Sequence, residues 1–175
     1  VKIVENNLIA YSQNNLPAGV SVPDLTDVGA VFSKDCTGDA ATRGYCFTGV
    51  IDRAKPYESC TNYDAANPTN TPLWEQPTVW DTAARTQEVT VAVTPGGAAD
   101  PTKTGNMEAQ YIVEFMCFTL KDKTFGAIED DRNNNVATEA THMPMYRITA
   151  LVEGLGGRSR VMAQSMVKIN LSEGF

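Results

Sequence analysis

The segment YRITALVEGLGGRSRVMAQSMVKI, residues 146–169, places a glycine-rich turn between two stretches of alternating apolar residues. The two stretches are MYRITALVE (145–153) and SRVMAQSMVKI (159–169), joined through GLGGR. A period of two is typical of a strand with one buried face, and a short glycine-rich link favours an antiparallel hairpin. The residues expected to share a face are Ile148, Ala150 and Val152 in the first stretch, and Val161, Ala163, Val167 and Ile169 in the second.

Two further strands are expected upstream of this hairpin. QEVTVAVT (87–94) alternates valine with threonine and alanine, and AQYIVEFMCFTL (109–120) is apolar on both sides. A strand with two apolar faces is expected at the centre of a sheet. Along this strand Tyr111, Val113, Phe115 and Cys117 are expected on one side, and Ile112, Glu114, Met116 and Phe118 on the other.

The first 16 residues have a different period. Val1, Val4 and Leu8 recur at helical spacing, and Pro17 and Gly19 follow the segment. We therefore expect an amphipathic helix over 1–16 that docks through these three side chains. The chain opens without methionine, which suggests that a targeting segment was removed, and we expect this helix to be the tail of a longer one.

Residues 17–86 are rich in proline, glycine, asparagine and threonine, with short apolar runs, and are expected to be irregular. The predicted fold class is therefore α+β, with the 1–16 helix packed on a four-stranded antiparallel sheet formed by residues 87–175. A length of 175 residues fits a single domain, 1–175.

Four cysteines, an even number without C-x-x-C spacing, indicate two disulfides and an oxidising compartment. Three connectivities are open, and we favour Cys36–Cys46 and Cys60–Cys117, since the first pair closes a short polar loop. The alternative is four buried thiols in a cytosolic protein.

Charge excludes several classes of partner. The net charge is −7, from 21 acidic and 14 basic residues, and there is no lysine- or arginine-rich cluster. A phosphate backbone or an anionic lipid surface is a poor partner for such a chain. No window has the roughly 18 consecutive apolar residues of a membrane span.

Residues that could support catalysis are few. His142 is the single histidine, expected in a loop, and no G-x-S-x-G motif provides a nucleophile for it. The acidic run 129–131 has no opposing carboxylate in the sequence, and GLGG (154–157) lies between strands instead of opening a helix. We predict that the chain is not an enzyme and uses no cofactor.

The acidic loop contains one candidate ligand set, for calcium. Asp131, Asn133 and Asn135 match the start of an EF-hand loop, but its sixth position is Val136 and its twelfth is His142. A solvated turn is the simpler interpretation. Trp74 and Trp80 lie in the irregular region, where they either stack on a sugar or pack beneath loops.

The closing segment resembles the C-terminal hairpin of PilX-type minor pilins of the bacterial type IV pilus. That family typically ends with a Tyr-Arg-Ile-Thr-Ala strand, a glycine-rich turn and a strand with valine and Gln-Ser. The matching residues are Tyr146, Arg147, Ile148, Thr149 and Ala150, then Gly154, Gly156 and Gly157, then Val161, Gln164 and Ser165. AQYIVEFMC (109–117) is similar to the family's preceding strand, so the resemblance covers roughly the last 65 residues.

The resemblance implies a structural subunit that helps to prime pilus assembly and contributes to adhesion or aggregation. It implies an inner-membrane and periplasmic location before assembly and a cell-surface pilus afterwards. The partners would be other pilin subunits, the membrane through an N-terminal helix absent from this sequence, and a host or surface receptor. The alternatives are a pseudopilin of a type II secretion system and a secreted carbohydrate-binding module.

Overall fold

The strands in the described part of the chain form one mixed β-sheet. The computed structural model describes residues 32–40, 42–47, 71–93, 105–120, 142–153 and 159–168. The strands are β1 (Tyr45–Phe47), β2 (Gln87–Val93), β3 (Gly105–Leu120), β4 (His142–Glu153) and β5 (Arg160–Lys168). The helical turns are the 3₁₀ turns η1 (Leu73–Glu75) and η2 (Ala83–Arg85) and the short α-helix α3 (Pro77–Trp80).

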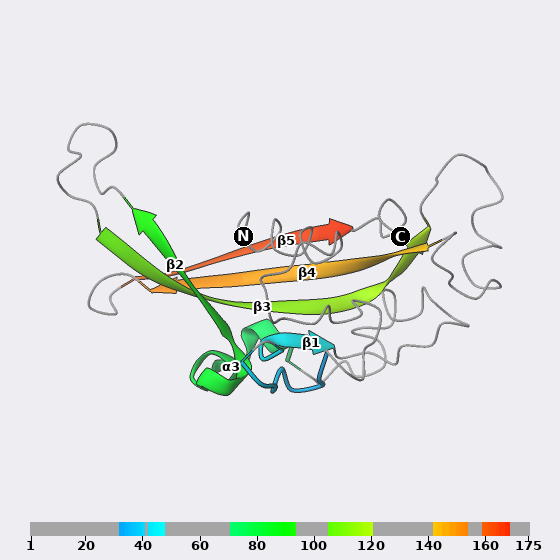
Figure 1. The fold of residues 1–175 in the computed structure, drawn as a ribbon, viewed down its shortest axis with the longest axis horizontal. Coiled ribbons are helices and arrows are strands. Elements are labelled where there is room, and N and C mark those ends of the chain that lie inside the picture. The colour runs from blue at the N-terminus through cyan, green and yellow to red at the C-terminus, as the bar shows by residue number, and fades with distance from the viewer. Residues whose placement is uncertain are drawn as a thin grey trace.

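β3 is the central strand. One of its edges pairs antiparallel with β4, which in turn pairs antiparallel with β5. Its other edge is shared, because β2 pairs antiparallel with residues 105–111 and β1 pairs parallel with residues 113–115. Figure 1 shows β3, β4 and β5 as three long, adjacent ribbons, with β1 and α3 near each other on the β3 side.

The predicted fold class is wrong. The sheet has five strands and is mixed, because β1 joins it in parallel from a region expected to be irregular. Helix is almost absent from the described residues, where α3 has four residues. The predicted helix over 1–16, with Val1, Val4 and Leu8, lies outside the described residues, so no helix of that kind is seen packed on the sheet. A three-residue strand is too short for a periodic pattern, which is why the sequence does not reveal β1.

The closing hairpin is confirmed. β4 and β5 pair antiparallel without a break from Met145↔Lys168 to Glu153↔Arg160. Two of the expected apolar pairs are register partners, Val152↔Val161 and Ala150↔Ala163. Ile148 instead pairs with Ser165, Val167 pairs with Tyr146, and Ile169 lies outside the described residues.

A β-bulge changes the expected faces of β3. Phe115 pairs with Tyr146 and Cys117 pairs with Met145, so the single residue Met116 is inserted between consecutive pairs. An extra residue reverses the side on which the following side chains point. The prediction that Cys117 shares a face with Phe115 is therefore wrong, because the alternation assumed an unbroken ladder.

An aromatic cluster covers one face of the sheet. Phe32 lies 5.6 Å from Tyr45, 5.7 Å from Phe115 and 5.8 Å from Tyr146, measured between ring centroids. The last two rings are themselves 5.5 Å apart in an edge-on arrangement. All four side chains are buried, and edge-on contacts at this separation add to the burial of their apolar area.

The opposite face is covered by the helical turns. Leu73, Val79 and Trp80 form one cluster with Ile112 of β3 and Leu151 of β4, and the two cysteines Cys36 and Cys46 complete it. Pro77 begins α3, where its missing N–H costs nothing, and the N–H of Asp81 closes the turn on the Pro77 carbonyl. With both faces covered, Ile112 and Val113 have no exposed surface.

Gly44 lets β1 approach β3. Its φ is +80°, a conformation that only glycine adopts without strain. Its carbonyl accepts a hydrogen bond of 2.8 Å from the N–H of Val113. A Cβ at this position would lie 2.9 Å from the backbone nitrogen of Gln87 and 3.2 Å from the carbonyl oxygen of Tyr111. Side-chain bulk would therefore separate β1 from β2 and β3.

We predict that Gly44→Ala lowers the free energy of unfolding by about 1–3 kcal/mol, since it combines a strained φ with backbone contacts that cannot yield. Urea unfolding followed by circular dichroism measures the loss. Thr90→Val, at an exposed position of β2, is the control and is expected to stay within about 0.5 kcal/mol of the parent. Equal stability of Gly44→Ala and the parent would contradict the described packing of β1.

Candidate assembly surface

β5 forms one margin of the sheet. Among the described residues, no strand pairs with the side of β5 that faces away from β4. β5 follows β4 in the hairpin, so its position is set by the pairing of the two strands. No described strand therefore pairs with the main-chain groups on its outer side.

The apolar side chains of β5 are exposed. Val161 is 63% exposed, Met162 40% and Met166 52%, and within the described chain these are the large hydrophobic side chains with high exposure. The buried core ends one strand earlier, since Leu151 of β4, the register partner of Met162, is only 3% exposed. β5 thus has apolar side chains that are not packed into the core.

The two ends of β5 differ in charge. At its start, Nε of Arg160 lies 2.8 Å from Oε1 of Glu153, and Nη2 lies 4.0 Å from Oδ1 of Asp81. Two carboxylates and one guanidinium leave this end with a net negative charge. At its other end Lys168 is exposed. Between Arg160 and Lys168 the strand has no charged residue.

A buried ion pair crosses the middle of the sheet. Arg147 of β4 donates two hydrogen bonds to Glu114 of β3, from Nε at 2.7 Å and from Nη2 at 2.8 Å. Glu114 is 1% exposed and Arg147 15%. A bidentate arrangement of this kind fixes both side chains, and its attraction offsets the cost of removing the charges from water.

The ion pair also positions the helical turns. The guanidinium carbon of Arg147 lies 5.9 Å from the ring centroid of Trp74, within the range of a cation–π contact. The indole N–H of Trp80 donates to the Trp74 carbonyl at 2.9 Å. Trp80 is 4% exposed and Trp74 is partly buried against the core. Both tryptophans are therefore engaged in packing, which is one of the two interpretations of the sequence.

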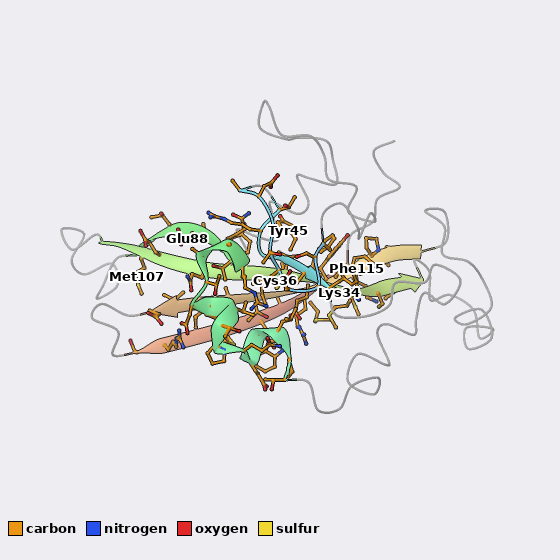
Figure 2. The ribbon with its side chains drawn as sticks, turned by 90° about the horizontal axis from the view of Figure 1, so that it is seen from below. Lys34, Cys36, Tyr45, Glu88, Met107 and Phe115 are labelled. Carbon is orange, nitrogen blue, oxygen red and sulfur yellow. A yellow bond between two sulfur atoms is a disulfide. The ribbon has the colours of Figure 1, made fainter. Side chains whose placement is uncertain are left out.

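A disulfide loop ends within β1 and lies over the sheet. Cys36 and Cys46 are bonded, with their Cα atoms 4.4 Å apart, and Figure 2 shows Cys36 near the middle of the strands, close to Tyr45. Arg85 donates from Nε to the Asp35 carbonyl at 2.5 Å. Gln87 donates to the Ala40 carbonyl at 3.0 Å. These bonds tie the loop to the segment that leads into β2.

The Asp35 carboxylate caps a turn at the start of this loop. Its Oδ1 accepts hydrogen bonds from the Thr37 hydroxyl at 2.6 Å and from the Thr37 amide at 3.3 Å. Chiefly because of that hydroxyl, the pKa of Asp35 lies below its usual value of 3.8, although partial desolvation acts in the opposite direction. The carboxylate is thus held in its charged form.

The cysteine prediction is confirmed for the Cys36–Cys46 bond. Cys117 is buried and also disulfide-bonded, but Cys60 lies outside the described residues, so Cys60–Cys117 stays a prediction. The calcium candidates Asp131, Asn133 and Asn135 also lie outside the described residues. Within the described ranges, no three histidine, cysteine or acidic side chains come together to hold a metal ion.

His142 is not in a loop. It is the first residue of β4 and the register partner of Leu120. The pairing of Glu114 with Arg147 was not predicted from the sequence. A signal was present, because each is a charge within the apolar middle of its strand, and buried charges of opposite sign on neighbouring strands are expected to pair.

The comparisons with known proteins identify no relative. No family model, no curated protein and no solved structure matches the chain. The helices in the described part of the chain include none with the length and apolar character needed to cross a membrane.

We predict that breaking the central ion pair is costly. Glu114→Leu or Arg147→Met alone should lower the free energy of unfolding by about 3–5 kcal/mol, because each leaves an uncompensated buried charge. In the double variant, the loss of free energy of unfolding should be clearly smaller than the sum of the losses in the two single variants. A double-mutant cycle by urea unfolding measures the coupling. For the exposed pair Glu153–Arg160 the same cycle is expected to give at most about 1 kcal/mol, and equal coupling energies would contradict the burial of Glu114.

The Asp35 turn predicts a pH dependence. A pKa lowered in the folded state adds stability above the unfolded-state pKa, and this stability is lost as the pH falls through the folded-state pKa. The carboxyl carbon of Asp35, followed by NMR, should therefore titrate below 3.8. Thr37→Val should raise that midpoint, whereas Thr90→Val should leave it unchanged. A midpoint that does not move in Thr37→Val would exclude the Thr37 hydroxyl as the cause.

Proposed function

We propose that this chain is a structural subunit of an exported filament, a minor pilin of the type IV pilus class, that contributes to pilus assembly. The observation that carries the proposal is the β4–β5 hairpin. Tyr146 to Ala150, which carry most of the resemblance to PilX-type minor pilins, lie in β4 and pair with β5. The resemblance therefore falls on residues that are consecutive partners in one hairpin.

The disulfide supports export. The bond between Cys36 and Cys46 forms and persists in oxidising compartments such as the bacterial periplasm. A cytosolic protein with four reduced thiols, the alternative considered from the sequence, fits this bond poorly. The proposed route is therefore the inner membrane and periplasm, followed by the cell surface.

The surface of β5 supports assembly with other subunits. A strand with exposed valine and methionine side chains is suited to contact with another protein chain. A role in adhesion or aggregation, with a host or surface receptor as partner, belongs to the same proposal. The two tryptophans offer less support for the carbohydrate-binding alternative, because Trp80 is buried and Trp74 is packed beneath Arg147.

Deletion of the gene tests the proposal. We expect fewer surface pili by electron microscopy and weaker cell aggregation, with both restored by the wild-type gene. Restoration by the Thr90→Val variant controls for expression. Normal piliation in the deletion strain would contradict the proposal, and loss of type II protein secretion in its place would favour the pseudopilin alternative.

A further inference from the structure

The methionines of the chain differ widely in their exposure to solvent. There are six, and all lie in β3, β4 or β5. Met166 is 52% exposed and Met162 40%, whereas Met116 is 8% exposed. The partly buried ones are Met107, Met143 and Met145. The oxidation of a thioether depends on the access of the oxidant to sulfur, so the two methionines of β5 are expected to react first.

The two exposed methionines lie on one face of β5. Alternate residues of a strand point to the same side, so Met162, Gln164 and Met166 share a face. Gln164, between the two methionines, donates from Nε2 to the Thr149 hydroxyl of β4 at 3.1 Å. β5 pairs with β4 in one register on both sides of this bond. The strand is therefore held in place by β4, while its two thioethers are in contact with water.

The cover on this face of the sheet ends at β4. Leu151, the register partner of Met162, is 3% exposed and belongs to the cluster formed by the helical turns. A sulfoxide oxygen on Met162 or Met166 stays hydrated, because neither side chain is buried. On Met116 the same oxygen would enter the core of the sheet. Oxidation of the β5 methionines is therefore compatible with the fold.

We propose that Met162 and Met166 form a reversible oxidation site, with a peroxide as the oxidant. One peroxide oxygen bonds to sulfur as the O–O bond breaks, the sulfur gives up two electrons, and the other oxygen leaves as water. A dithiol-dependent reductase reverses the step. The sulfoxide oxygen then leaves as water, and the dithiol supplies two electrons and two protons as it becomes a disulfide.

The state of this site sets the polarity of the β5 surface. A methionine thioether is apolar and flexible, whereas its sulfoxide is polar and accepts hydrogen bonds. Two sulfoxides on one face of a nine-residue strand replace the apolar side chains that Met162 and Met166 present in the reduced form. The proposal does not rest on the filament function and is tested on the purified chain.

Peptide mass mapping after treatment with hydrogen peroxide measures the order of oxidation. In the folded chain, Met166 and Met162 should each gain oxygen roughly tenfold faster than Met116, because of their exposure. In urea all six methionines should react at similar rates, since the fold no longer protects any of them. Methionine sulfoxide reductases with dithiothreitol should restore both β5 methionines, and the urea midpoint of the oxidised chain should equal that of the parent.

Two variants serve as controls. The double variant Met162→Leu with Met166→Leu keeps the apolar surface but removes both sulfurs, so the fast phase of oxygen uptake should disappear. Leu151→Met places a thioether beside Met162 but beneath the helical turns, and this new methionine should react as slowly as Met116. Circular dichroism checks that both variants fold.

Four results would overturn the proposal. They are oxidation of Met116 at the rate of Met166 in the folded chain, an unchanged fast phase in the double leucine variant, a lower urea midpoint after oxidation of the two β5 methionines, and sulfoxides that the reductases do not restore. Fast oxidation at position 151 in Leu151→Met would also contradict it, because exposure would then not select the site.

Discussion

The burial of β3 on both faces is the constraint on which the rest of the structure depends. Side chains from Tyr111 to Cys117 are buried whichever way they point, so each side of the strand needs a cover. Phe32 and the β1 aromatics provide one cover, and η1 with α3 provides the other. The disulfide loop and the ion pair both contact the segments that cover β3. Cys46 lies in the same cluster as Trp80, and Arg147 lies over Trp74.

The sequence predicted the strands better than it predicted the fold. β2, β3, β4 and β5 have a period of two or an unbroken apolar run, and such patterns extend over enough residues to be recognised. β1 could not be predicted, because its place depends on Gly44 and on a partner far along the chain. The face of Cys117 could not be predicted either, since nothing in AQYIVEFMCFTL marks where a bulge inserts a residue. Long patterns were therefore informative, and features decided by tertiary contacts were not.

The candidate surface was only partly visible in the sequence. The apolar residues of β5 were expected to be buried on one face, yet Val161 is exposed, because the core ends at β4. Periodicity indicates which residues share a face but not whether anything covers that face. The spacing of the cysteines was more informative, since Cys36 and Cys46 are close enough in sequence to close a short loop. The pairing of Glu114 with Arg147 required the register of β3 and β4, which the sequence does not specify.

The parallel pairing of β1 has a consequence for the order in which the protein folds. During synthesis β1 emerges roughly 70 residues before the part of β3 to which it pairs, so this contact closes a long loop, whereas the β4–β5 hairpin closes a short one. The hairpin and the β2–β3 pair can form as soon as their own residues leave the ribosome. Until then β1 cannot pair with β3, and the apolar surface of Tyr45 and Phe47 is exposed to aggregation or to binding by a chaperone.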